Sequence, residues 1–145
     1  MYPDKIAILL KKASLMCDRL ADPILKPHDL TLTQYKTLKF LLTQPPHTVH
    51  QVDIERRFSI TNPTVTGILH GLERKGLIER LADPEDGRSK VICPTERARA
   101  MESLLYQLGE RVEAEMTRDL DAGEREELMR LLKKVLAREG PQVDQ

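Results

Sequence analysis

The chain has 145 residues, of which 40% are hydrophobic and 32% are charged, with two Phe, three Tyr and no Trp. This length and composition are typical of one soluble, helix-rich domain with an aliphatic core, and they exclude a disordered chain. The 23 basic residues balance 23 acidic ones, so net charge alone gives no support to nucleic-acid binding.

The sequence carries no signal for a membrane, an export route or a disulfide framework. No apolar run approaches the roughly 18 residues that a membrane span needs, and the amino terminus lacks the charged-then-apolar layout of a secretory signal. Cys17 and Cys93 lie far apart without a Cys-x-x-Cys pattern, which favours reduced, structural thiols. We therefore expect a cytoplasmic protein without a membrane partner.

The amino-terminal third predicts two helices that pack together. Between Ile6 and Leu20 the apolar residues recur at a spacing of three and four, which is typical of one buried helix face. Pro23 and Pro27 predict the end of this helix or a break soon after it. Thr33 is the candidate N-cap of the second helix, which ends before residues 44–46.

Two shorter helices follow and predict a helix-turn-helix. Thr48 is the candidate N-cap of the first, and the second carries an apolar stripe between Val65 and Leu72. Pro63 suits the first turn of the second helix, and Gly76 suits a left-handed terminator. Many all-helical domains contain such a pair, so this spacing alone is weak evidence for DNA binding.

A predicted hairpin directly after the second helix makes the motif more specific. Residues 77–81 and 90–93 read as strands, and the Asp83-to-Gly87 segment reads as the turn between them. A hairpin at this position is typical of the wing of a winged helix-turn-helix.

Two further helices follow the hairpin. Thr95 and Glu96 open one long helix that is apolar on one face as far as Met116, and Asp121 with Glu124 resembles a capping box for a last helix. These helices and the first one hold more apolar surface than a small wing domain can cover, which favours an intermolecular helical interface. An intramolecular three-helix bundle is the alternative.

Taken together, these segments resemble the MarR family of winged-helix transcriptional regulators over nearly the full length. The resemblance rests on residues 60–66 running to 72–78, on residues 83–89 in the wing, and on Thr95-Glu96. The chain departs from the family at Pro94, at Ala98 and at Ile54-Glu55. The resemblance implies a mainly α fold with a small β-hairpin wing and with dimerisation helices at the N- and C-terminal ends. All of these elements would form one domain of residues 1–145. Residues 30–95 would form the DNA-binding lobe, and residues 1–29 and 96–145 the dimerisation region.

The resemblance also implies a function. Family members are homodimers that bind pseudo-palindromic double-stranded DNA and that are usually modulated by a small molecule or an oxidant. We therefore expect a ligand-responsive repressor that is not an enzyme and needs no cofactor. One branch of the family senses hydroperoxides with a first-helix cysteine, but Cys17 lies too close to residues 33–35 to match it, and a buried, inert thiol is the better interpretation.

The candidate DNA-binding residues fall in two groups. The first lies on the recognition helix, where side chains reach base edges and phosphates in the major groove; it comprises Thr61, Asn62, Pro63, Thr64, Thr66, Gly67, His70 and Arg74. A merely capping role for Thr61 or Asn62, and an ordinary surface position for His70, are the alternatives.

The second group lies in the wing and comprises Asp86, Arg88, Ser89 and Lys90. Arg88 is the strongest candidate, because a guanidinium at a wing tip fits the narrow, electronegative minor groove of A·T-rich DNA. Asp86 is expected to orient the Arg88 side chain by a charge-assisted hydrogen bond. A solvated turn explains Asp83 and Gly87 well, but it explains Arg88 less specifically.

Other functional readings have weaker support. Effector binding between the DNA-binding lobe and the dimer helices would involve Met16, Leu20, His28 and Tyr35, although core packing explains all but His28 equally well. The His47-x-x-His50 pair is a weak zinc signal, and we expect no metal site. No phosphate-binding glycine loop, His-Glu-x-x-His pattern or nucleophile motif is present. A winged-helix module that binds only protein is the competing hypothesis.

Overall fold

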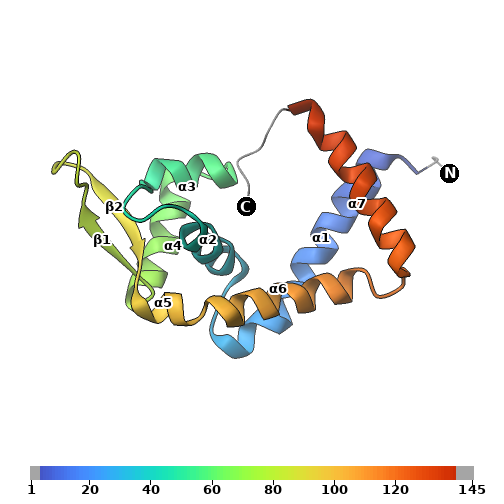
Figure 1. Ribbon diagram of the computed structural model, residues 1–145, viewed down its shortest axis with the longest axis horizontal. Helices are drawn as coiled ribbons and strands as arrows, with labels where there is room; N and C mark the ends of the chain where they lie inside the picture. The colour runs from blue at the N-terminus through green and yellow to red at the C-terminus, as the bar shows by residue number, and fades with distance from the viewer. Residues whose placement is uncertain (1–3, 140–145) are drawn as a thin grey trace.

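The computed structural model describes residues 4–139, which form a mainly helical chain with one antiparallel hairpin (Figure 1). In chain order the elements are α1 (Ile6–Leu25), the 3₁₀ turn η1 (Lys26–His28), α2 (Leu32–Thr43), α3 (Gln51–Phe58), α4 (Asn62–Arg74), β1 (Ile78–Ala82), β2 (Lys90–Pro94), α5 (Glu96–Ala100), α6 (Glu102–Met116), α7 (Ala122–Leu136) and the 3₁₀ turn η2 (Ala137–Glu139). The predicted dimerisation segments begin and end outside the described residues, at 1–3 and 140–145.

The first two helices meet at a proline-containing break. α1 continues through Pro23, and the chain turns just after it in η1, which contains Pro27. Thr31, rather than the predicted Thr33, caps α2: its Oγ1 accepts a hydrogen bond from the Gln34 amide, and the Gln34 side chain accepts one from the Thr31 amide, both at 3.2 Å. The glutamine three residues after Thr31 completes a capping box, so it decides where the helix starts.

The helix-turn-helix consists of α3 and α4. His50, rather than the predicted Thr48, is the N-cap of α3, because the Asp53 carboxylate three residues later accepts a hydrogen bond from the His50 amide at 2.8 Å. Ser59 ends α3 in the left-handed region with a φ of 53°. The chain then extends through Thr61, which is the N-cap of α4.

The wing joins the recognition helix through Gly76, whose φ of +70° confirms the predicted left-handed terminator. β1 and β2 pair antiparallel, with Ile78 opposite Pro94 at the end of the ladder. Pro94 lacks a backbone N–H, but the connection between β2 and α5 is made by the next residue. The Thr95 amide donates to the Leu77 carbonyl at 3.0 Å, and the Thr95 hydroxyl caps α5.

The helix predicted to run unbroken from residue 95 to Met116 is divided at Met101. The Met101 amide donates to Ala98, three residues back, and its backbone angles of −88° and −3° form a tighter turn than an α-helix allows. The helical pattern starts again when the Leu105 amide donates to Met101. As a result, α5 stays against β2, and α6 runs alongside α1.

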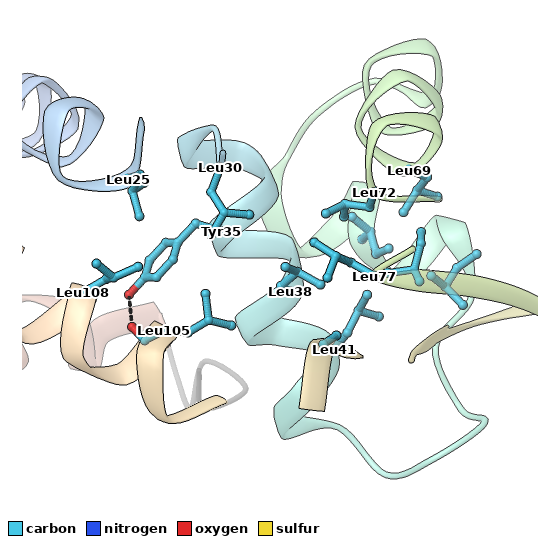
Figure 2. Packing of buried hydrophobic residues seen from close by; sticks show 14 of the residues in the cluster. Leu25, Leu30, Tyr35, Leu38, Leu41, Leu69, Leu72, Leu77, Leu105 and Leu108 are labelled. Atoms are coloured by element: carbon cyan, nitrogen blue, oxygen red, sulfur yellow. Dashed lines mark hydrogen bonds between the residues drawn. The ribbon is translucent and has the colours of Figure 1, made fainter. Parts of the chain in front are cut away.

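One core joins the helix-turn-helix to α1 and α6. Its fully buried leucines come from four helices and are Leu25, Leu38, Leu69, Leu72, Leu105 and Leu108. Figure 2 shows the Tyr35 ring among the leucines of α1, α2 and α6, with its hydroxyl directed at α6. That hydroxyl donates to the Leu105 carbonyl at 3.3 Å, which satisfies its polar atom inside the core. α2 is therefore the central element of the fold.

α1 and α7 leave apolar surface uncovered at the end away from the wing (Figure 1). α7 buries none of its residues, so it does not complete an intramolecular three-helix bundle with α1 and α6. Its exposed stripe, each member at least 42% accessible, is Leu128, Met129, Leu131, Val135 and Leu136. On α1 the exposed apolar residues include Ile6, Leu9 and Leu15. Within residues 4–139, no helix has both the length and the apolar character to cross a membrane.

Candidate nucleic-acid interface

The outer face of α4 is a continuous exposed surface. Val65, Leu69 and Leu72 are fully buried beneath it and hold the helix against the core. Seven of the eight residues predicted on this helix are exposed: Thr61, Asn62, Pro63, Thr64, Gly67, His70 and Arg74. The eighth, Thr66, is half-buried. The amphipathic pattern of the sequence therefore placed these residues on the exposed side of the helix.

The middle of this face is flat and unpartnered. A Cβ atom built at Gly67 would meet no heavy atom within 4 Å, so packing inside the chain does not require the glycine. The side chains of His70 and Arg74, further along the helix, have no hydrogen bond or ion pair within residues 4–139. The surface is thus open to an incoming ligand.

Two side chains of α3, which no sequence pattern marks, hold the start of α4. Gln51 Nε2 donates to Thr66 Oγ1 at 2.8 Å and to the Asn62 carbonyl at 3.4 Å. Glu55 Oε2 accepts a hydrogen bond from Asn62 Nδ2 at 3.2 Å. Because each bond crosses between the two helices, only the assembled motif reveals these residues.

The other end of α4 is fastened to the junction of α1 and α2. Lys75, the C-cap residue, donates from Nζ to the Asp29 carbonyl at 2.5 Å and to Gln34 Oε1 at 2.7 Å. Asp29 has a φ of 55°, in the left-handed region, which turns its carbonyl group into the reach of Lys75. The orientation of α4 therefore depends on the amino-terminal helices as well as on α3.

The hairpin carries Arg88 near its tip. The Asp86 carboxylate accepts a hydrogen bond from the Arg88 backbone amide at 3.1 Å, so it shapes the turn; the expected bond from Asp86 to the guanidinium is not formed. The Arg88 guanidinium has no hydrogen bond or ion pair within the described part of the chain. Ser89 donates its hydroxyl to the Asp86 carbonyl at 3.3 Å, and Lys90 is exposed. The tip thus presents two available cations.

His50 joins the helix-turn-helix to the wing. Its Nε2 lies 2.7 Å from Asp83 Oδ2, and its Nδ1 lies 3.6 Å from Asp53 Oδ2. The hydrogen bond with Asp83 is the main cause that raises the pKa of His50 above its usual value. The pKa of Asp83 is lowered, first by a hydrogen bond from the Glu85 amide and then by the one from His50. Both shifts favour the charged pair.

A cavity of about 390 Å³ opens between α2 and α3. Its lining combines three cations, three aromatic rings and one hydroxyl, and no carboxylate: Tyr35, Lys36, Lys39, Phe40, Thr43, Arg57 and Phe58. The Lys39 Nζ lies 5.3 Å from the centre of the Tyr35 ring, and the Arg57 guanidinium carbon lies 5.5 Å from that of Phe58. The Nε atom of Arg57 is buried and has no hydrogen-bond partner.

The four residues predicted for an effector pocket are not gathered in this cavity. Tyr35 lines it, whereas Leu20 lines a different cavity together with Pro23. Met16 is 38% exposed on α1, and His28 lies in η1. The three cations that line the cavity together with Tyr35 are Lys36, Lys39 and Arg57, and no sequence motif marked them.

The remaining histidine and the cysteines lie apart from the candidate DNA-binding surface. His47 Nδ1 lies 3.5 Å from Cys93 Sγ in β2, whereas His50 Nε2 lies 2.7 Å from Asp83 Oδ2 beyond the end of β1. Among residues 4–139, no three His, Cys, Asp or Glu side chains are grouped so that they could hold a metal ion. Burial raises the pKa of the Cys17 and Cys93 thiols, which favours the neutral, unreactive form.

Known proteins resemble this chain in both sequence and structure. The MarR family model matches residues 30–90. The chain is similar to the reduced form of MarR from E. coli, with 30% identity over 94% of this chain and 99% of that chain and a TM-score of 0.85.

Two similar structures contain DNA. A complex of MepR from S. aureus with DNA has 29% identity, covers 93% of this chain and 98% of that chain, and has a TM-score of 0.76. A mutant of E. coli MarR bound to operator DNA has 31% identity, coverages of 90% and 93%, and a TM-score of 0.77. These matches confirm the predicted winged-helix fold. The chain belongs to the MarR family, whose members are transcriptional regulators and not enzymes.

Proposed function

We propose that the protein is a sequence-specific DNA-binding transcriptional regulator that acts as a homodimer on pseudo-palindromic duplex sites. The observation that carries this proposal is the free polar surface formed by the outer face of α4 and the tip of the wing, where Arg88 has no partner among the described residues. The two relatives solved with DNA support it, because this chain shares their fold over at least nine-tenths of its length.

In this proposal α4 enters the major groove. Asn62 and Thr64 lie at its exposed start and reach base edges, where an asparagine amide pairs with adenine and a threonine methyl contacts thymine. Thr61, Pro63 and Thr66 set the first turn, and Gly67 lets the backbone approach the DNA. His70 and Arg74 contact phosphates further along the helix.

The wing contacts the neighbouring minor groove. Arg88 inserts its guanidinium, since a narrow minor groove concentrates negative potential. Ser89 and Lys90 bind the flanking phosphates, and Asp86 holds the turn through the Arg88 amide. A chain of zero net charge can bind a polyanion in this way, because Arg74, Arg88 and Lys90 are exposed on the surface that would face the DNA.

The homodimer is formed by residues 1–29 and 96–145, while residues 30–95 bind DNA. Support comes from the exposed apolar residues of α1 and α7, including Ile6 at 75% and Val135 at 55% accessibility. A contiguous apolar surface of this kind is typical of an obligate interface. Two-fold symmetry would present two recognition helices to half-sites about one helical turn, roughly 34–36 Å, apart.

A binding experiment separates this function from a winged-helix module that binds only protein. The probe is a duplex from upstream of the protein's own gene, titrated by fluorescence anisotropy over a salt series, with a scrambled duplex of equal composition as the control. Selective binding that falls steeply with salt is expected, because phosphate contacts release counterions. Equal or absent binding to both duplexes at low salt would favour the protein-binding module.

We further propose that the regulator is a repressor that responds to a small organic anion in the cavity between α2 and α3. Lys36, Lys39 and Arg57 supply positive charge there without a lining carboxylate, and Phe40 and Phe58 supply apolar walls. The buried Nε of Arg57 has no hydrogen-bond partner among the described residues, and a rotation of the guanidinium toward a carboxylate ligand would satisfy it. The cavity volume lies within the usual range for small-molecule sites, roughly 300–1,000 Å³.

Titration with benzoate tests the cavity. Isothermal calorimetry should detect binding to the native protein and little binding to a Lys39→Gln, Arg57→Gln double variant, whereas Lys26→Gln, which removes an exposed cation elsewhere, should bind normally. Benzoate should also weaken binding to the duplex, since a ligand regulates only if it prefers one spacing of the recognition helices. Equal benzoate affinity in the native protein and the double variant would exclude this cavity.

A further inference from the structure

His50 occupies the point where the helix-turn-helix meets the wing. It is the residue before α3, and its backbone amide is held by Asp53 at 2.8 Å. Its ring lies between α3 and the wing: Nδ1 is 3.6 Å from an oxygen of Asp53 on α3, and Nε2 is 2.7 Å from an oxygen of Asp83, 33 residues later in the chain. Figure 1 shows α3 beside the wing at this point.

Asp83 organises the turn that carries Arg88. Its Oδ1 accepts a hydrogen bond from the Glu85 amide at 2.9 Å, and its Oδ2 accepts one from the Ser89 hydroxyl at 3.4 Å. The Asp83 amide also donates to the Ser89 carbonyl at 3.0 Å. One carboxylate therefore binds both sides of the turn, and the same oxygen that receives Ser89 also faces His50.

Apart from this pair, one nearby hydrogen bond holds the wing against the start of α3. The Ile92 amide in β2 donates to the Val49 carbonyl at 2.8 Å. Two more contacts fix the base of the hairpin: Arg80 Nε donates to Glu73 Oε1 on α4 at 2.5 Å, and Cys93 Sγ lies 3.5 Å from His47 Nδ1. Among the described residues, the bond between His50 and Asp83 is the one that attaches the turn itself to the helix-turn-helix. The wing and the recognition helix must keep a fixed relative position if they are to enter two neighbouring grooves.

We propose that His50 is a positioning residue for DNA binding, which fixes the wing to the helix-turn-helix through Asp83 and makes operator affinity depend on pH. This inference rests on the proposed DNA-binding function. His50 itself need not contact DNA: it acts by holding Arg88 where the minor groove will be, so that less freedom is lost on binding.

The charges around His50 determine the sign of the pH dependence. Asp53 faces it from α3 and Asp83 faces it from the wing, and both carboxylates raise the pKa of the imidazole. The charged bridge is complete below the ordinary histidine value of 6.5 and is lost as the pH rises through the raised value. The pKa of Asp83 is lowered from 3.8, so its carboxylate stays ionised throughout this window. Operator affinity should therefore fall as the solution becomes alkaline.

The test uses the duplex that the full-length protein binds selectively, with anisotropy titrations at fixed ionic strength between about pH 6 and pH 8.5, a range that spans the ordinary histidine value. His50→Gln should weaken binding by about twofold to fivefold at the acidic end, as expected for loss of an exposed charged pair, and by less at the alkaline end. Asp83→Asn should abolish the same pH dependence and should add a loss at every pH, because Asp83 also holds the turn through Glu85 and Ser89. Adding His50→Gln to Asp83→Asn should change affinity little. His50→Lys should retain affinity across the range, because a lysine stays charged.

Matched controls separate positioning from fold or net charge. Asp119→Asn makes the same charge change as Asp83→Asn at an exposed site between α6 and α7, and it should keep the native pH profile. Thermal melts should show all variants folded. A His50→Gln protein with native affinity and pH profile, or with an equal loss at every pH, would overturn the inference while leaving DNA binding intact. Failure of the native protein to prefer its duplex would instead refute the proposed function.

Discussion

Arg88 is the residue on which the DNA-binding proposal makes its sharpest prediction. Its guanidinium has no partner among the described residues, so removing it should leave the fold unchanged. Arg88→Ala should weaken binding to the operator duplex by about 1–3 kcal/mol, the range for a good groove contact. Anisotropy titration at fixed salt measures the change. Arg118→Ala, which removes an exposed arginine between α6 and α7, is the matched control, and an Arg88→Ala affinity equal to that of the control would contradict the wing assignment.

Asn62 shows how a contact inside the protein limits what a residue can read. Its amide nitrogen already donates to Glu55 at 3.2 Å. Bidentate pairing with adenine uses both the nitrogen and the oxygen of the asparagine side chain, so base reading requires this bond to break or be shared. The sequence predicted Asn62 as a DNA-binding residue, but it contained no sign of this competition, because the partner lies on the preceding helix.

At the scale of single elements, the contact of α6 with α2 depends on Gly109. A Cβ atom at this position would lie 2.5 Å from the Tyr35 hydroxyl oxygen, and Tyr35 is only 8% exposed. Gly109→Ala should therefore destabilise the protein by about 1–3 kcal/mol through overpacking, measured by urea denaturation. Gly67→Ala is the control: it has open space and should stabilise the protein by up to about 1 kcal/mol. Equal changes in the free energy of unfolding for the two substitutions would show that α2 and α6 can move apart to accommodate the added methyl group.

The sequence predicted the existence and order of the elements better than their ends. Apolar spacing and turn residues located the helices and the wing, and Gly76 adopts the left-handed conformation expected of it. The starts of α2 and α3 were misplaced because Thr33 and Thr48 resemble caps, and the residue three positions later decides between candidates. No proline or glycine near Met101 predicts the division between α5 and α6. The division depends instead on tertiary packing, because α5 contacts β2 whereas α6 contacts α1.

The candidate site was predictable to the extent that it lies on one helix face or one turn. Apolar periodicity predicted the exposed face of α4, where seven of the eight predicted residues lie, and the composition of the turn pointed to Arg88. Pairs such as Gln51 with Thr66, or His50 with Asp83, bring together side chains from different elements. Such pairs appear only after folding, and one sequence contains no local pattern that connects their members.

At the scale of the whole molecule, the exposed stripe of α7 predicts that folding and assembly are linked. Leu131→Glu should place a charge in the proposed interface and yield a monomer at concentrations where the native protein is a dimer, as measured by sedimentation. Lys133→Glu, on the same helix but off the apolar stripe, should stay dimeric. The unfolding temperature of the native protein should rise with protein concentration. A native protein that sediments as a monomer would refute the homodimer.

The fastening of Lys75 to Asp29 and Gln34 has a mechanical consequence in the proposed dimer. It ties the carboxyl end of α4 to the junction where α1 meets α2. With 20 residues, α1 is about 30 Å long, and tilting a rod of that length by about 5° moves its end by about 2.6 Å. This displacement approaches the roughly 3.4 Å between successive bases of one DNA strand. If the proposed dimer forms through α1, this helix would act as a lever arm, and a tilt of a few degrees at the interface would shift each recognition helix by most of a base step.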